Sequence, residues 1–233
     1  MSTLLLVRHG QASFGSENYD RLSALGELQV GHLREHFRRI GQPIDALYSG
    51  PLHRQQTTAA ILGATHGCTV KTLAAFDEYD AQALIHRHAK LTGSTLASLQ
   101  SVGSENGAKL DPRAFQRRLE AVGRAWIAGE LDHSDIEPWH SFRGRVAAGI
   151  ETVMNAEGRS RDIVISTSAG VIGAAVAHVL GLDDHGALRL SWVVLNASIT
   201  RIRFDGERCS LEGFNAVPHL EAQPEPRALL TYR

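Results

Sequence analysis

The sequence predicts an α/β protein: a three-layer α/β/α sandwich with a mostly parallel central sheet and a helical cap insertion. Two observations predict this class. Short apolar, β-branched runs at residues 3–7, 45–48, 70–76 and 162–166 end in polar residues, and most give way to helical periodicity, as strands of a parallel sheet do. Residues 81–158 lack strand signal and show only helical periodicity, which indicates the cap.

The first half of the chain alternates predicted strands and helices. After the run at 3–7, apolar residues recur at helical spacing over residues 23–40, until a glycine and a proline end the pattern. The run at 45–48 is followed by Pro51. Because proline suits the first position of a helix, we expect a second helix to begin there, with Arg54 in its first turns.

The middle of the chain begins with the run at 70–76, which leads into the acidic cluster at 77–80. Residues 92–112 are rich in Gly, Ser and Thr and have weak periodicity, which predicts a loop within the insertion. The apolar residues that mark the two helices of the insertion are Phe115, Leu119, Val122 and Trp126, and then Phe142, Val146, Ile150 and Val153.

The last third returns to the α/β pattern. The run at 162–166 is followed by a nearly all-apolar helix at 171–180, which must be buried. Residues 193–204 and 209–214 flank an Asp-Gly turn and predict a terminal hairpin. We therefore expect one domain, residues 1–233, with a helical cap insertion at about 81–158.

The composition excludes several classes of protein. Hydrophobic residues make up 43% and charged residues 21% of the chain, with a formal net charge of −1, so no global attraction draws it to nucleic acid. The apolar run before Arg8 is too short for a signal sequence or a membrane span, and we expect a cytoplasmic protein. Two cysteines in unrelated contexts predict neither a disulfide framework nor a thiolate metal site. The sequence leaves the oligomeric state open, a homodimer included.

The first predicted strand is followed by the segment Arg8-His9-Gly10-Gln11, in which every residue except the glycine has a polar side chain. A guanidinium group can bind phosphate oxygens through two hydrogen bonds, while a neutral imidazole attacks phosphorus in line. The alternative is a partly buried histidine that caps a strand end. The tetrapeptide alone does not decide between the two.

Further segments support the first interpretation, because together they resemble the histidine phosphatase superfamily, which includes the phosphoglycerate mutases. They occur in the order found in that family and span nearly the whole chain. The segments are Leu5-Leu6-Val7-Arg8-His9-Gly10, residues 19–26 with Gln29, Tyr48-Ser49-Gly50-Pro51-Leu52-His53-Arg54-Gln55-Gln56-Thr57, Glu78, residues 141–146, residues 196–200 and residues 215–220.

The resemblance implies a role for each of several residues. His9 would be phosphorylated, and Arg8 and Arg54 would bind the phosphoryl oxygens. Glu78 would donate a proton to the leaving oxygen and later accept one from water, although the sequence also offers Asp77 and Asp80 as the acid. The resemblance implies neither a metal nor a cofactor, and the partner would be a small-molecule phosphate monoester.

The remaining expected substrate contacts come from Gln11 and from Ser168. Ser168 stands where the family has a second histidine, so a cationic donor is replaced by a hydroxyl group. Losing one such donor typically costs about 2.7–4 kcal/mol in the transition state. The N-terminus of the helix that follows and the serine hydroxyl could offset part of this loss. Gly15 is a second departure, since mutase-like members have a polar side chain there; Ser13 and Ser16 lie nearby.

The other histidines and the tryptophans do not predict a second site. His86 and His88 diverge on a helix, so a substrate-facing basic role suits them better than a metal. Trp126, Trp139 and Trp192 show no aromatic spacing pattern and are expected to pack in the core or cap.

The function predicted from the sequence is therefore a histidine acid phosphatase-type enzyme that hydrolyses phosphate monoesters through a phosphohistidine on His9. The alternative is a catalytically impaired phosphate-ester binding or regulatory protein, which the serine at position 168 suggests. Phosphoglycerate mutase activity is a third and weaker alternative, because nothing in the sequence supports it directly.

Overall fold

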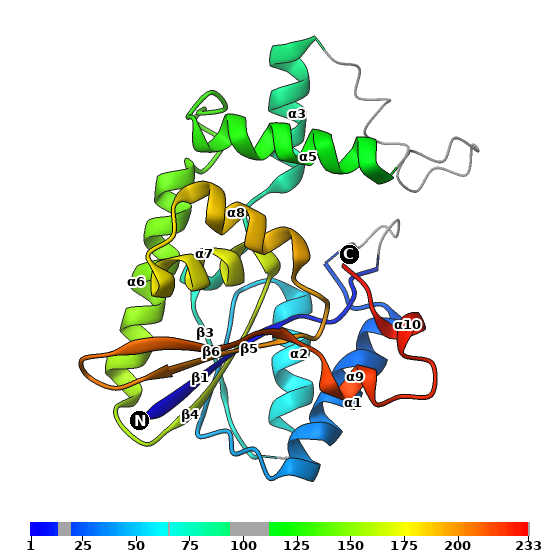
Figure 1. The fold of residues 1–233 in the computed structure, drawn as a ribbon, viewed down its shortest axis with the longest axis vertical. Helices are drawn as coiled ribbons and strands as arrows, with labels where there is room; N and C mark the ends of the chain where they lie inside the picture. The colour runs from blue at the N-terminus through cyan, green and yellow to red at the C-terminus, as the bar shows by residue number, and fades with distance from the viewer. Residues whose placement is uncertain (14–19, 65, 94–111, 233) are drawn as a thin grey trace. The chain divides into compact units, whose positions relative to one another are not determined.

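The computed structural model describes residues 1–13, 20–64, 66–93 and 112–232 (Figure 1). Its centre is a six-stranded sheet with the order β3-β2-β4-β1-β5-β6. The four strands β3, β2, β4 and β1 are parallel to one another, and β5 pairs antiparallel with both β1 and β6. The strands are β1 (Ser2–Arg8), β2 (Ala46–Ser49), β3 (Val70–Thr72), β4 (Asp162–Thr167), β5 (Ile199–Phe204) and β6 (Cys209–Ala216).

Helices follow most of the strands, which confirms the predicted α/β class with a mostly parallel sheet. A 3₁₀ turn covers Ala74–Phe76. The helices are α1 (Ala24–Ile40), α2 (His53–Gly63), α3 (Ala81–Thr92), α5 (Pro112–Ile127), α6 (Trp139–Glu157), α7 (Ala169–Leu180), α8 (Asp184–Val193), α9 (Pro218–Glu221) and α10 (Pro226–Leu229).

Strand β1 is buried along its whole length, as the central position requires. Successive side chains of a strand point to opposite faces of the sheet. Leu5 and Val7 belong to the core cluster that also contains Phe37 of α1 and Leu62 of α2. Figure 1 shows α1 and α2 on one side of the strands and α7 on the other. The layers are held together mainly by the burial of apolar surface.

Three predicted elements differ from the structure. The strand predicted over 70–76 ends at Thr72, and the chain then turns into the 3₁₀ helix. The predicted strand over 193–204 begins only at Ile199, because residues 184–193 form helix α8, which the sequence did not predict. Pro51 lies before the N-cap residue of α2 rather than at its first helical position.

The chain divides into two compact units, residues 1–78 with 145–233, and residues 79–144. The second unit contains an aromatic cluster of Tyr79, Trp126, Trp139 and Phe142, with neighbouring ring centroids 4.8–5.8 Å apart. The predicted packing role of Trp126 and Trp139 is therefore confirmed. The description of this region as a cap on a single domain stays a prediction.

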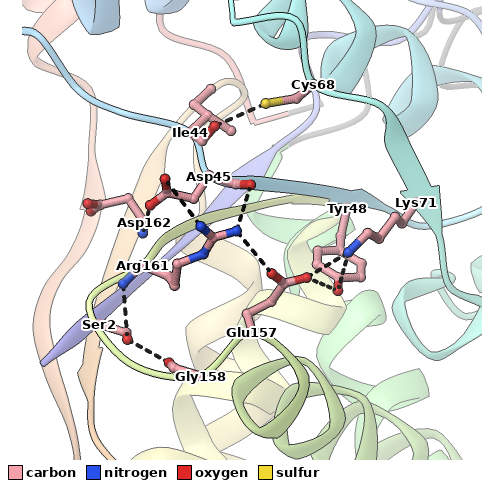
Figure 2. Close-up of polar contacts among 10 residues, drawn as sticks. All are labelled: Ser2, Ile44, Asp45, Tyr48, Cys68, Lys71, Glu157, Gly158, Arg161 and Asp162. Atoms are coloured by element: carbon pink, nitrogen blue, oxygen red, sulfur yellow. Dashed lines mark hydrogen bonds and ion pairs between the residues drawn. The ribbon is translucent and has the colours of Figure 1, made fainter.

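The last turn of α6 is joined to β2 and β3 by a polar network (Figure 2). The Glu157 carboxylate accepts hydrogen bonds from the Tyr48 hydroxyl at 2.5 Å and from Lys71 Nζ at 2.7 Å, and Arg161 lies 3.8 Å away. Burial opposes ionisation of Glu157, but these two hydrogen bonds outweigh it and hold the pKa of the carboxyl below its usual value. A buried charge is tolerated here because it is paired and hydrogen-bonded.

His219 of α9 is almost completely buried, with 2% of its surface exposed. Neither ring nitrogen has a hydrogen-bond partner among the residues that the structure describes, and the ring of His36 lies 6.1 Å away, centroid to centroid. Burial and the neighbouring His36 and His32 lower the pKa of His219 to about 3. The folded protein therefore keeps this imidazole neutral.

We predict that His219 makes the protein sensitive to acid. The unfolded chain binds a proton at this histidine below about pH 6.5, whereas the folded chain does not until about pH 3. Each pH unit within that window then costs up to about 1.4 kcal/mol of stability. His219→Phe should reduce the fall in urea midpoint between pH 7 and pH 5, whereas replacing the exposed His185 by Phe should not. Equal falls in wild type and H219F would contradict the prediction.

Candidate active site

The candidate site begins at the end of β1, where His9 follows the strand. Its backbone N–H donates to the carbonyl of Thr167 at 2.9 Å, and its carbonyl accepts from Asn196 Nδ2 at 3.2 Å. The next residue, Gly10, lies so close to α1 that a Cβ atom there would be 2.4 Å from the carbonyl oxygen of Gly26. Only glycine fits this close approach. The backbone of His9 is thus held by β4, by the segment after α8 and, through Gly10, by close packing against α1.

The imidazole of His9 is 5% exposed and has a defined hydrogen-bond pattern. Nδ1 lies 2.7 Å from the carbonyl oxygen of Gly10, which can only accept, so Nδ1 carries the proton. The other nitrogen, Nε2, accepts a hydrogen bond from Nε of Arg54 at 3.2 Å. The lone pair of Nε2 therefore points at the guanidinium group of Arg54.

The electrostatic surroundings of His9 keep the ring neutral. Its pKa lies well below the usual value, because burial disfavours the charged form and because the positive charges of Arg8 and Arg54 are close by. The hydrogen bond to Gly10 acts in the opposite direction and is outweighed. A neutral imidazole at neutral pH is the form with a lone pair available for attack.

Arg54 lies in the first turn of α2, with 9% of its surface exposed. Its Nη1 forms an ion pair with Asp20 Oδ1 at 2.8 Å. The same carboxylate accepts from the backbone N–H of His53 at 2.8 Å and of Arg54 at 3.4 Å. The N-cap residue Leu52 has no side-chain acceptor, so Asp20 takes the part of a cap and also fixes the guanidinium.

Arg8 is also 9% exposed, and its Nη1 donates to the backbone carbonyl of Val194. That contact anchors the guanidinium beside the loop that follows α8. Around His9 the site thus has two arginines and one neutral imidazole, with the carboxylate of Asp20 paired to Arg54. Such a balance favours a bound anion.

The three acidic candidates have different surroundings. One oxygen of Glu78, Oε2, accepts a hydrogen bond from the backbone N–H of Gly170 at 2.8 Å, in the first turn of α7. Asp80 instead caps α3, accepting from the N–H of Ala83 at 2.9 Å. The backbone carbonyl of Asp77 accepts from Arg145 at 2.8 Å. Glu78 is therefore the one of the three that the structure holds against the start of α7.

Ser168 is the residue before α7 and is 1% exposed. Its hydroxyl oxygen accepts a hydrogen bond from the side-chain amide of Gln55 at 2.8 Å. Gln55 directly follows Arg54 in α2 and is completely buried. The position of the expected second histidine is thus built around a serine–glutamine pair.

Gln11, the remaining predicted contact, is hydrogen-bonded toward α1. Its side-chain carbonyl accepts from Ser23 Oγ at 2.8 Å, and its backbone N–H donates to Gln29 Oε1 at 2.8 Å. Gly15 and Ser16, where the second departure from the family falls, lie outside the described residues.

The structure thus brings His9 and Arg54 into direct contact and places Arg8 beside them. Sequence reasoning assigned no role to Asp20, Gln55 or Asn196. Asp20 pairs with Arg54, Asn196 donates to the backbone carbonyl of His9, and Gln55 donates to Ser168. All three do lie in segments that carry the family resemblance, which was the available signal.

A family model, the histidine phosphatase superfamily (branch 1), matches residues 4–217. The chain belongs to this superfamily. No curated protein matches the chain. None of the described helices is long and apolar enough to span a membrane.

Solved structures with the same fold cover nearly the whole chain. The phosphoserine phosphatase of Entamoeba histolytica has a TM-score of 0.66 and 18% identity, covering 94% of this chain and 100% of its own. A mycobacterial glucosyl-3-phosphoglycerate phosphatase has a TM-score of 0.64 and 21% identity, with coverage of 92% and 99%. A putative α-ribazole-5′-P phosphatase of Escherichia coli has a TM-score of 0.65 and 16% identity, with coverage of 93% and 98%. At these identities the likeness shows the fold.

Proposed function

We propose that the protein is a phosphomonoesterase that works through a phosphohistidine on His9. The observation that carries the proposal is the contact between His9 Nε2 and Arg54 Nε at 3.2 Å, with both side chains buried. A phosphate oxygen would take over this N–H from the imidazole, which frees the lone pair of Nε2 and places phosphorus next to it. Family membership and the phosphatase names of the three structures above support the reaction class.

In the first step, Nε2 of His9 forms a bond to phosphorus while the bond from phosphorus to the ester oxygen breaks. Glu78 gives its proton to the departing oxygen, so an alcohol leaves. The positive charge that forms on the imidazole is stabilised by the hydrogen bond from Nδ1–H to the Gly10 carbonyl, and the guanidiniums of Arg54 and Arg8 neutralise the phosphoryl oxygens.

In the second step, water attacks phosphorus and gives a proton to Glu78, and the bond between phosphorus and Nε2 breaks. Inorganic phosphate leaves, while His9 and Glu78 return to their starting states. The steps need no metal ion to balance, because the two arginines supply the positive charge. The substrate would be a small-molecule phosphate monoester.

A binding protein with impaired catalysis is the second candidate, favoured by Ser168. Its side chain is a neutral hydroxyl, which is buried and accepts a hydrogen bond from Gln55. It cannot supply the positive charge of a histidine. The loss of one such donor, about 2.7–4 kcal/mol, slows an enzyme without abolishing its activity. A slow enzyme and a binding protein differ in whether the phosphoryl group ever reaches His9.

Trapping of the intermediate separates the two candidates. An aryl phosphate labelled in its phosphoryl group is mixed with the enzyme and quenched in alkali, which preserves a bond between nitrogen and phosphorus. We expect label on the peptide that contains His9 and none in His9→Asn. Binding of the aryl phosphate without any label on wild-type protein, across quench times from milliseconds to minutes, would favour the binding protein.

A further inference from the structure

Gln55 is a buried amide that the reaction described above does not use. It is completely buried, and all three of its side-chain hydrogen bonds are made inside the protein. Oε1 accepts the backbone N–H of Leu52 at 3.1 Å, and Nε2 donates to the backbone carbonyl of Phe76 at 3.2 Å. Because these two partners are backbone groups of fixed polarity, the orientation of the amide is determined.

The third hydrogen bond of Gln55 runs from Nε2 to Ser168 Oγ at 2.8 Å. One amide nitrogen therefore contacts both segments that hold Glu78. Phe76 lies two residues before Glu78 in the chain, and Ser168 lies two residues before Gly170, whose N–H binds the Glu78 carboxylate. The other end of the amide, Oε1, binds the N–H of Leu52, the N-cap residue of α2, which lies two positions before Arg54.

The packing around this amide leaves little freedom. The Phe76 carbonyl accepts a second hydrogen bond, from Thr167 Oγ1 at 2.8 Å. A Cβ atom on Gly50 would be 2.1 Å from Gln55 Oε1 and 2.3 Å from the Phe76 carbonyl oxygen. The Gln55 backbone carbonyl also accepts from Ser166 Oγ at 2.8 Å. A shift of the amide would therefore be passed on to the Phe76–Glu78 segment.

We propose that Gln55 is a positioning residue that sets Glu78 at a fixed place relative to the Arg54–His9 pair. The inference rests on the function proposed above. A general acid must lie within hydrogen-bond reach of the oxygen that it protonates. In this chain the amide of Gln55 connects the helix that carries Arg54 to both anchors of Glu78.

The reaction offers a readout that a merely structural role would not change. Protonation matters for an alkyl phosphate, whose leaving alkoxide is strongly basic, and matters little for 4-nitrophenyl phosphate, whose leaving phenolate is stable without a proton. Gln55→Met keeps the length of the side chain and removes its hydrogen bonds. We expect kcat/KM to fall about tenfold to a hundredfold for glycerol 2-phosphate and less than about threefold for 4-nitrophenyl phosphate.

Two further variants sharpen the test. In a Glu78→Gln background, Q55M should cause no further loss with glycerol 2-phosphate, because the group that it positions has lost its proton. Ser168→Ala removes only one of the contacts of Gln55, so it should shift the ratio of the two substrates in the same direction by a smaller factor. This second variant tests the proposal even if Q55M fails to fold.

Gln29 provides the matched control. It is also completely buried, and its amide makes the same number of hydrogen bonds, donating to Leu229 and Thr231 and accepting from Gln11. Gln29→Met should leave the ratio of kcat/KM for the two substrates unchanged. Equal losses on both substrates in Q55M and S168A, or an additive loss in the Glu78→Gln background, would overturn the positioning role.

His9→Asn separates this outcome from failure of the proposed function. If H9N loses both activities and Q55M loses both equally, the phosphatase proposal stands and the positioning role is wrong. If H9N hydrolyses both esters as fast as wild type, the reaction does not use His9, and both proposals fall together.

Discussion

Replacing His9 by Asn is expected to lower kcat/KM for an aryl phosphate at least about a thousandfold, the scale on which enzymes lose activity without their nucleophile. The amide nitrogen of asparagine can still donate to the Gly10 carbonyl, as Nδ1 does now at 2.7 Å. The side-chain oxygen of asparagine, however, is a poor nucleophile toward phosphorus. The variant thus preserves the local hydrogen bond and removes only the nucleophile.

The measurement is steady-state hydrolysis together with phosphate binding by calorimetry. We expect H9N to retain phosphate affinity within about tenfold, since two arginines carry most of the attraction. The exposed His185 on α8 offers a control, and His185→Asn should hydrolyse at the wild-type rate. Turnover by H9N within tenfold of wild type would show that another group attacks phosphorus.

Much of the fold was predictable because periodicity is a local property of the sequence. Strand β1, helix α1 and helix α7 were predicted within a few residues, since their apolar patterns are strong and their ends are marked. Helix α8 was missed because Val193 and Val194 extend an apolar run that suits a strand equally well. The chain instead ends the helix there and turns the Val194 carbonyl toward Arg8.

The site was predictable only in part, because its contacts join distant parts of the chain. The pairing of Asp20 with Arg54 spans 34 positions, and that of Gln55 with Ser168 spans 113. The spacing of residues along the sequence does not predict such long-range contacts. The family resemblance named His9, Arg8, Arg54 and Glu78, but it could not show that an amide takes the place next to Ser168.

Removal of the charge of Arg54 is expected to have the second largest effect. Arg54→Met should lower kcat/KM about a hundred- to a thousandfold, because the phosphoryl oxygens lose a buried donor where negative charge develops. Asp20, which now pairs with Nη1 at 2.8 Å, would keep its carboxylate near the site and repel the phosphate. Arg38→Met is the control, since that arginine is exposed and pairs with Glu35 at the end of α1.

The pH profile of R54M provides a second, independent readout. Burial and the charge of Arg8 would still lower the pKa of His9, but the contribution of Arg54 to that lowering would be gone. The His9 pKa should therefore rise, so that more of the imidazole is protonated as the pH falls and the lone pair is lost. We expect the ratio of wild-type to R54M kcat/KM to grow from pH 8 to pH 5.

Arg54→Lys separates charge from geometry. A lysine keeps the positive charge near His9 and so should keep the pH profile close to that of wild type, but it lacks the planar fork that binds two oxygens at once. Most of the rate loss should therefore remain while the pH effect disappears. A ratio that stays constant with pH in R54M would mean that Arg54 does not tune His9, and its contact with Nε2 would then serve phosphate binding alone.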